Sequence, residues 1–199
     1  YGANFICFWD ELSFYQDKAT ERFADILIDQ NLDIFFSASC RSELLNWDSY
    51  QIAEKLKQAG CKGLGFALES GNEEILKAMN KHNHVTDFVT QAQVCHAAGI
   101  EVYTSLVFGY PQETKDTIKE TFRVCRDAHI YPSVGYLQPM PGTPMYQHAK
   151  TVGAIQDDEN YLMIMGDRQD LRVTLSDHLT GDEMEAGGAV VVHGDAVDH

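Results

Sequence analysis

Several features that would assign the chain to a special class of protein are scarce or missing. No stretch of about 18 apolar residues occurs, so the sequence predicts no membrane-spanning helix. Basic residues are few, because 15 lysines and arginines stand against 30 acids and leave a formal net charge of −15. An acidic surface repels phosphate backbones, and we therefore expect no nucleic acid among the partners.

The cysteines lack the spacing that metal sites need. No two of the five lie closer than 21 residues, and neither a CxxC motif nor a cluster of cysteine and histidine occurs. His82 and His84 form a His-x-His pair without a third ligand. Scattered reduced thiols and the absence of a signal peptide predict a cytoplasmic protein with no metal ligands in this chain. The cysteines are Cys7, Cys40, Cys61, Cys95 and Cys125.

A repeat of about thirty residues dominates the part of the chain up to residue 150. Apolar, β-rich runs are separated by segments with helical patterns, and thirty residues is the length of one βαβ step. The continuous apolar character of the runs is typical of parallel strands that are covered on at least one face. The runs begin near Ala3, Asp33, Lys62, Glu101 and Tyr131.

The helices between these strands have recognisable ends. Gly60 and Gly99 are expected to stop two of them, and the longest interval, of 39 residues, is expected to hold two helices. The expected N-caps are Asp17, Asp48 (with Gln51 in a capping box), Asn72, Thr86 and Thr114.

Repeated β/α steps imply right-handed crossovers with the strands side by side in sequence order. Five steps fall short of the eight in a complete barrel, so the pattern predicts an α/β fold with a parallel sheet that forms part of a TIM-like barrel. A doubly wound sheet is the alternative, but no GxGxxG turn follows the first strand.

The pattern fades after Lys150. Residues 151–199 carry −9 of the formal charge, from 11 acids and two arginines, with Leu171–Leu175 as a possible short strand. The sequence therefore predicts two parts, a partial barrel over residues 1–150 and a partly ordered acidic extension over residues 151–199.

Polar residues follow the predicted strands, and in parallel β/α folds ligands bind at the carboxyl ends of the strands. Glu69 comes directly after an apolar run, so its carboxylate needs a partner, either a ligand or a structural ion pair. Arg41 holds a carboxylate or pairs with Glu43. Gly109 permits close approach or a positive φ, and Pro111 stiffens the same loop.

Four patches taken together resemble the radical S-adenosylmethionine (SAM) enzymes, over roughly residues 3–150. By pattern, the chain is most similar to the cobalamin-binding branch, which includes methyltransferases and Fe–S oxidoreductases like the anaerobic magnesium-protoporphyrin monomethyl ester cyclase. Methylthiotransferases share a similar patch on the third predicted strand. The patches are FWDELSF (8–14), AGCKGLGFALESG with ILKAMNK (59–81), GYPQET (109–114) and PMPGTP (139–144).

The resemblance implies cofactors that this chain does not hold alone. The family's CxxxCxxC signature is absent, and the chain has no initiator methionine and opens on an apolar run. We interpret it as an excised fragment that starts at the family's second strand, without the first β/α unit and the cluster loop. The [4Fe–4S] ligands, and a possible cobalamin domain, would lie outside this chain. The full-length enzyme would cleave SAM to a 5′-deoxyadenosyl radical that acts on a small-molecule substrate, and the fragment alone is expected to be inactive.

The resemblance also assigns SAM-binding residues. Asp10 and Glu11 match a motif near the amino group, although the usual Gly-Gly-Glu is missing, while Ser39 and Arg41 end a strand where polar contacts to SAM occur. Glu69 would accept the ribose hydroxyls, Lys81 would neutralise the carboxylate and share a rim with Glu69, and Ser105 would face the nucleoside. Gly109 and Pro111 would shape the loop beneath adenine. The candidate cofactor-binding residues are Glu69, Lys81, Ser39, Arg41, Ser105, Asp10, Glu11 and Gly109, with no catalytic or metal-binding residue expected in this chain.

Two other functions stay open from the residues alone. Glu69 with Asp10 or Lys81 could serve as the acid and base of a hydrolase or lyase. A non-catalytic binding domain on a β/α sheet is the second. If the chain is instead the fragment that the resemblance implies, the family neighbour of its first strand is absent. That strand is then expected to be an exposed edge that pairs in a homodimer, is covered by the tail, or lowers solubility.

Overall fold

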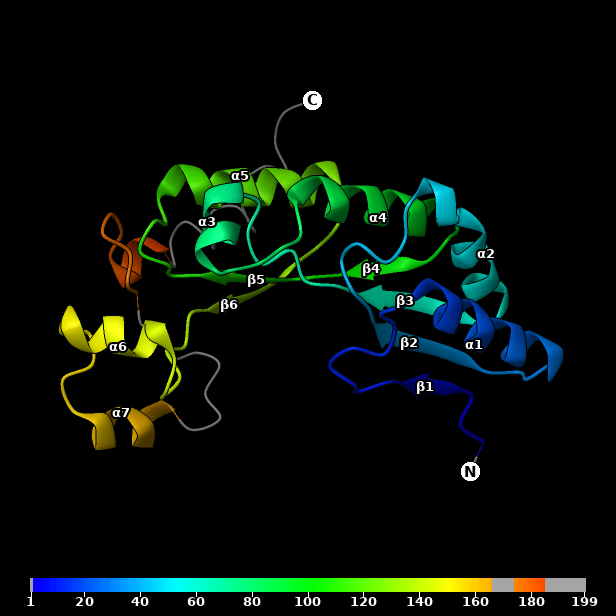
Figure 1. Cartoon of the computed structure of the whole chain (residues 1–199), viewed down its shortest axis with the longest axis horizontal. Coiled ribbons are helices and arrows are strands. Elements are labelled where there is room, and N and C mark those ends of the chain that lie inside the picture. Colours follow the sequence, from blue (N-terminus) through cyan, green and yellow to red (C-terminus); the bar gives the residue numbers. More distant parts are fainter. Residues whose placement is uncertain (1, 166–173, 185–199) are drawn as a thin grey trace. The chain divides into compact units, whose positions relative to one another are not determined.

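The computed structural model describes residues 2–165 and 174–184, and the chain forms two compact units (Figure 1). The first unit comprises Tyr1–Leu68, Lys81–Ser105 and Val124–Ser133. The second comprises Glu69–Asn80, Leu106–Arg123 and Val134–His199.

The first unit contains a four-stranded parallel sheet in the order β1-β2-β3-β4. The strands follow one another in sequence order, which confirms the predicted parallel α/β class. A bulge between Phe36 and Ser37 shifts the register of β2 against β3. The strands are β1 (Phe5–Cys7), β2 (Phe35–Ser39), β3 (Cys61–Gly65) and β4 (Glu101–Tyr103).

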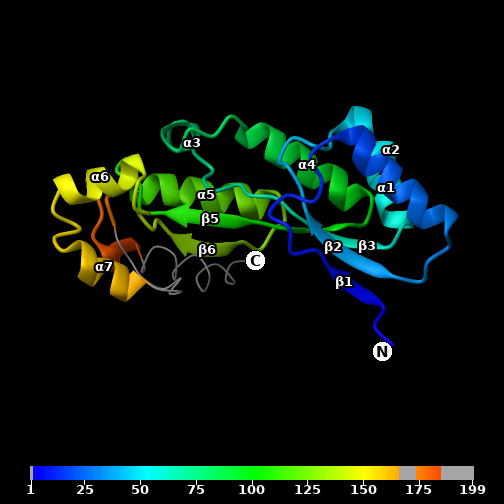
Figure 2. The ribbon, with the colours of Figure 1, turned by 60° about the horizontal axis from the view of Figure 1, so that its bottom comes forward.

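One side of this sheet carries the helices of the first unit, as Figures 1 and 2 show. Phe36, Ala38 and Leu64 point toward the helices and are buried, whereas the alternate residues Ser37 and Ser39 are only half-buried. The sheet is therefore buried on the face toward the helices, as apolar burial requires. The helices are α1 (Asp17–Asp29), the 3₁₀ helix η1 (Trp47–Ser49), α2 (Tyr50–Gln58) and α4 (Val85–Ala97).

Strand β1 is the edge of this sheet and is exposed. Phe5 and Ile6 are 51% and 43% exposed, and Trp9 just beyond the strand is 93% exposed. The predicted exposed edge is therefore confirmed for β1. The tail that was one expected cover falls largely in residues outside those described.

Three of the expected N-caps are wrong by one or two residues. Asp17 is the first residue of α1, which has no side-chain cap. Asp48 lies inside η1, because Asn46 accepts the backbone N–H groups of Asp48 and Ser49 and so starts the turn earlier. Thr86 lies within α4, which begins after His84. Each of these helices therefore begins earlier than the sequence predicts, either because a residue upstream caps it or because it begins without a side-chain cap.

The other helix ends are confirmed. Asn72 caps α3 (Glu73–Ala78) by accepting two backbone N–H groups, and Thr114 accepts the N–H of Thr117 at the start of α5 (Lys115–Asp127). Gly60 and Gly99 end their helices at φ +101° and +74°. The 39-residue interval holds the two expected helices, α3 and α4.

The fourth predicted strand is broken into two at Thr104. Its buried hydroxyl accepts the N–H of Leu68 at 2.9 Å, and its carbonyl accepts the N–H of Ser133 at 2.8 Å. Beyond this residue, β5 (Ser105–Phe108) leaves the four-stranded sheet and pairs with β6 (Ser133–Tyr136). A sequence pattern of continuous apolar residues does not reveal such a change of partner.

In the second unit, α6 (Pro144–Thr151) and α7 (Asp158–Met165) form a hairpin. Its two helices are joined by Asp158, which accepts a hydrogen bond from the Tyr146 hydroxyl and pairs with Lys150. The buried cluster beneath them consists of Leu137, Tyr146, Ala149, Ile155, Tyr161 and Leu175. Among the described residues, no helix has both the length and the apolar character to cross a membrane.

Candidate functional site

The turn after β1 carries the first pair of predicted site residues. Asp10 and Glu11 are both exposed. The chain then returns to the end of β2, where the N–H groups of Ser13 and Phe14 donate to the carbonyl of Ser39 at 2.9 and 3.0 Å. The backbone bonds therefore place this turn beside the carboxyl end of β2, while the two carboxylates face solvent.

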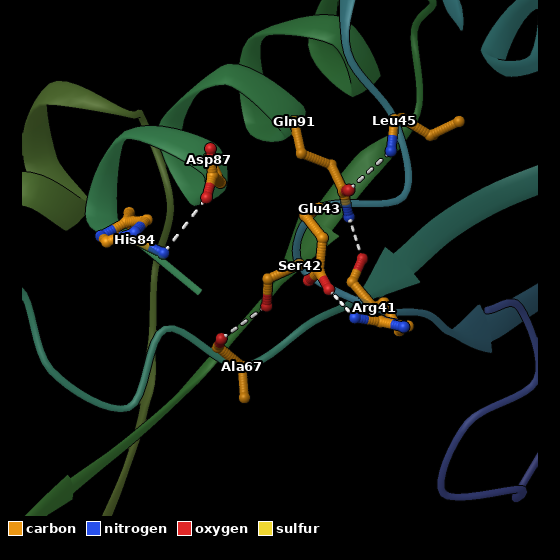
Figure 3. A network of polar contacts seen from close by, with 8 residues as sticks. All are labelled: Arg41, Ser42, Glu43, Leu45, Ala67, His84, Asp87 and Gln91. Atoms are coloured by element: carbon orange, nitrogen blue, oxygen red, sulfur yellow. Dashed lines mark hydrogen bonds and ion pairs between the residues drawn. The ribbon is translucent and has the colours of Figure 1, made fainter. Parts of the chain in front are cut away.

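The loop after β2 is fixed by a residue that sequence reasoning missed. Gln91 of α4 is fully buried, and its carboxamide accepts the N–H of Leu45 and donates to the carbonyl of Arg41, both at 2.8 Å (Figure 3). Ser42 adds a hydrogen bond to the carbonyl of Ala67. The available signal was a polar residue at a helix position whose neighbours at i−3 and i+4, Phe88 and Cys95, are apolar.

Arg41 itself forms an ion pair with Glu43 in this loop (Figure 3). The two side chains are 54% and 38% exposed. Of the two readings left open by the sequence, the structure shows the pairing with Glu43. Ser39, at the end of β2, is half-buried.

The cysteines of the described residues do not form a cluster site. All five are free, and four are buried. Burial raises the pKa of Cys61, Cys95 and Cys125 to about 12, and it raises the pKa of Cys40 as well, so these thiols stay protonated at neutral pH. Within residues 2–165 and 174–184, no three His, Cys, Asp or Glu side chains converge as metal ligands do. These residues therefore do not fit a [4Fe–4S] cluster.

In the second unit, Glu69 has an unusual backbone conformation. Its φ is +63°, in the left-handed region that costs most residues other than glycine free energy. Its carbonyl accepts the N–H of Val107 at 3.0 Å, which ties this residue to β5. Burial raises the pKa of the Tyr110 hydroxyl, and the charge of Glu69 raises it further.

The turn that follows Glu69 is bound tightly to α5. The buried hydroxyl of Thr121 accepts the N–H of Gly71 at 2.9 Å and lies 3.4 Å from the hydroxyl of Ser70. Asn72 donates to the Glu120 carboxylate at 2.7 Å. These bonds hold the backbone after Glu69 and stabilise its strained conformation. Thr121 was missed because a threonine within an amphipathic helix gives no distinct sequence signal.

The loop from Gly109 to Glu113 encloses a buried acid. Gly109 has φ +111°, which confirms that this position requires a positive φ. Glu113 is fully buried, its Oε1 accepts the hydroxyl of Thr117 at 2.7 Å, and its Oε2 makes no hydrogen bond within the described residues. Burial raises the pKa of Glu113 to about 7, although Thr117 and the nearby N–H of Gly109 favour the charged form. This acid, which the sequence analysis also missed, is the last residue of the loop.

Two further candidates belong to the first unit. Lys81 lies three residues beyond the end of α3, and Ser105 begins β5 and is exposed. Since Glu69 belongs to the second unit, the expected shared rim of Glu69 and Lys81 stays a prediction. What the structure brings together is Glu69 with β5, the strand that leads into the Gly109–Glu113 loop.

The chain is similar in sequence and in fold to known proteins. Residues 2–125 match the family model described as the Radical SAM superfamily. The chain is 26% identical over 146 residues to an uncharacterized methyltransferase from Pyrococcus horikoshii, a match that covers 70% of this chain and 31% of that protein. It is 28% identical over 102 residues to the bacteriochlorophyllide d C-12(1)-methyltransferase of Chlorobaculum tepidum, covering 50% of this chain and 22% of that protein.

Among solved structures, the radical S-adenosylmethionine methyltransferase TsrM from Kitasatospora setae, with cobalamin and a [4Fe–4S] cluster bound, superposes with a TM-score of 0.59. The sequence identity is 17%, and the match covers 73% of this chain and 29% of that protein. At this identity the likeness supports a common fold. The chain spans less than a third of each of these three proteins.

Proposed function

The chain belongs to the radical SAM superfamily, and on that premise we propose that it is the SAM-binding part of an iron–sulfur enzyme of the cobalamin-binding branch. Methyltransferases are among the proteins it resembles, which supports methyl transfer as the reaction class, with a cyclase-type oxidoreductase as the second candidate. The match over most of the chain argues against an ordinary hydrolase or lyase built on Glu69.

The observation that carries the proposal is the constrained backbone of Glu69. Its φ of +63° is held between a turn bound to α5 and a parallel bridge to Leu106 of β5, the strand that leads into the Gly109–Glu113 loop. A carboxylate accepts hydrogen bonds from two vicinal hydroxyls, as the ribose of SAM offers. The residues of the second unit therefore fit the nucleoside half of SAM, with Glu69 on the ribose and Gly109 and Tyr110 beside the base.

The remaining candidates belong to the first unit or its boundary. We propose that Ser39, Arg41, Asp10, Glu11, Lys81 and Ser105 serve SAM as the resemblance implies. The support is their place after parallel strands or at a basic position of the family pattern, and each requires its own variant. An iron–sulfur cluster, held by thiolates other than those described, would supply the electron that cleaves SAM.

The proposed setting of this enzyme is cytoplasmic, with a small-molecule substrate and no nucleic-acid partner. Five free thiols support the compartment, and the net charge of −15 argues against a phosphate backbone. The exposed edge of β1 supports a homodimer through that strand, because unpaired edges pair with other chains.

The test of the nucleoside site is SAM binding by the intact protein under non-reducing conditions, measured by equilibrium dialysis. Glu69→Gln removes one charged acceptor, and we expect the Kd for SAM to rise about tenfold or more. Glu74→Gln, on the exposed first turn of α3, is the matched control and should leave the Kd unchanged. Unchanged affinity in Glu69→Gln would remove Glu69 from the site.

A further inference from the structure

A short segment of the acidic extension binds the Gly109–Glu113 loop from outside. The N–H of Leu175 donates to the carbonyl of Gly109 at 3.0 Å, and the N–H of Asp177 donates to the carbonyl of Pro111 at 3.1 Å. Alternate residues are thus paired on both sides, as when a strand is added to an edge. Between them, the Ser176 hydroxyl donates to the carbonyl of Glu113 at 2.7 Å.

The segment is firmly anchored within the second unit. Leu175, Leu179 and Met184 are 4%, 6% and 0% exposed. Ser176 also accepts the N–H groups of His178 and Leu179, both at 3.0 Å, so its hydroxyl orders the turn as well as the contact.

An ion pair and a cap fix the far end of the segment. The Glu183 carboxylate accepts the N–H of Thr180 at 3.1 Å and lies 2.9 Å from the Lys115 ammonium, at the first residue of α5. The segment therefore spans the loop from Gly109 to the start of α5.

Two hydrogen bonds hold the loop from its own side: the N–H of Glu113 donates to the carbonyl of Tyr110 at 2.9 Å, and the Thr117 hydroxyl donates to the Glu113 carboxylate at 2.7 Å. Gly109 adopts φ +111°, Pro111 has no N–H to donate, and the carboxyl of Glu113 is buried with one oxygen unbonded within the described residues. Three successive alternate carbonyls, those of residues 109, 111 and 113, are satisfied by the segment instead. The loop conformation is thus specified in large part from outside.

We propose that Thr174–Met184 is a strap that positions the nucleoside-binding loop, and that Ser176 is its positioning residue. This inference rests on the proposed function, in which Gly109 and Tyr110 lie beside the base of SAM. The strap binds the backbone carbonyls of the loop and does not itself contact SAM. It acts on SAM by fixing the conformation of the loop backbone. The acidic extension is then part of the SAM-binding apparatus.

The test uses the intact protein and two readouts, amide hydrogen exchange of the peptide that contains Val107–Glu113 and the Kd for SAM without reductant. Ser176→Ala should speed exchange in that peptide and raise the Kd about five- to tenfold. Ser176→Thr keeps the hydroxyl and should restore both. Asp177→Ala is the matched control, because the Asp177 side chain is exposed and its contact is made by the backbone N–H. A purely structural role would change the melting temperature and leave the Kd of the folded protein unaltered.

Two loop variants separate failure of the strap from failure of the proposed function. Gly109→Ala introduces a side chain at φ +111°, and Tyr110→Ala removes the phenol without touching the backbone, so one serves if the other does not fold. If these weaken SAM binding while Ser176→Ala alters neither exchange nor affinity, or alters exchange alone, the strap is wrong. If the loop variants that fold leave the Kd unchanged, the proposed nucleoside site is wrong, and the strap with it.

Discussion

The two units differ in where they keep their acids. In the first unit, the predicted site carboxylates Asp10 and Glu11 are exposed in a turn, and the buried polar residues, such as Gln91, Ser42 and Thr104, are neutral. In the second unit, Glu113 is fully buried with a pKa of about 7. Buried acids with shifted pKa values collect at functional sites, so this difference favours the second unit as the place of chemistry.

Both units hold their loops with side chains that bond the backbone. The loop after β2 in the first unit is fixed by the carboxamide of Gln91 and the hydroxyl of Ser42. In the second unit, the hydroxyls of Thr117, Thr121 and Ser176 each bridge a loop to a helix or to the strap. Hydroxyls both donate and accept, which suits them to backbone and carboxyl groups in the same small space.

The largest expected effect concerns the [4Fe–4S] cluster, which the described residues of the two units do not fit. The isolated chain, reconstituted anaerobically with iron and sulfide, should bind no stable [4Fe–4S] cluster, because its described thiols are buried and protonated or single. Iron and sulfide analysis with the visible spectrum measures this. About four irons per chain together with reductive SAM cleavage would contradict it.

Much of the fold of the first unit could be predicted from the sequence, but little of the fold of the second unit could. The thirty-residue rhythm predicted β1 to β4 in order, because covered parallel strands have continuous apolar runs. The repeat could not show that the strand pairing changes at Thr104. That change depends on which backbone N–H groups bond to the hydroxyl and the carbonyl of Thr104.

The candidate site shows the same limit. Glu69 and Gly109 were found because each directly follows an apolar run of the sequence. Glu113, Thr121 and Ser176 were missed because their importance arises from burial and from partners distant in the chain, such as the 63 residues between Ser176 and Glu113. The strap lies in a segment whose composition alone resembles a solvated tail.

The next largest effect is a dependence of the free energy of unfolding on pH. It arises from Glu113, the buried acid of the second unit. The pKa of Glu113 is raised from 4.5 to about 7, so the folded chain holds a proton that the unfolded chain releases between these pH values. The free energy of unfolding should therefore fall as pH rises from 4.5 to about 7, by on the order of 2–3 kcal/mol, and level off above that range.

Urea unfolding at a series of pH values measures this dependence. Glu113→Gln keeps the acceptor for Thr117 and should remove the decline, whereas Glu54→Gln, an exposed position on α2, should retain it. A wild-type profile that rises or stays flat from pH 4.5 to 7 would show that Glu113 is charged in the folded chain.

In the first unit, the corresponding test is a substitution of Gln91, with the free energy of unfolding as the measured quantity. Replacing Gln91 with alanine leaves the N–H of Leu45 and the carbonyl of Arg41 buried without their partner, and we expect a loss of about 2 kcal/mol in the free energy of unfolding. Gln93→Ala, two residues along the same helix and exposed, is the control and should change stability by less than about 0.5 kcal/mol. Equal effects of the two variants would mean that the loop after β2 is held by other contacts.

Substitution of Arg41 should have the smallest effect on stability. It is also the most direct test of whether a charged residue of the first unit binds SAM. The ion pair of Arg41 with Glu43 is exposed, so Arg41→Ala and Glu43→Gln should each change the free energy of unfolding by less than about 1 kcal/mol. Their effects on SAM binding should differ, since loss of Arg41 removes a cation proposed to face SAM, whereas Glu43→Gln only frees that cation. We expect a higher Kd for SAM in Arg41→Ala and an unchanged or lower Kd in Glu43→Gln. Equal affinity in both variants and the wild type would confine Arg41 to its ion pair with Glu43 and remove it from the proposed SAM site.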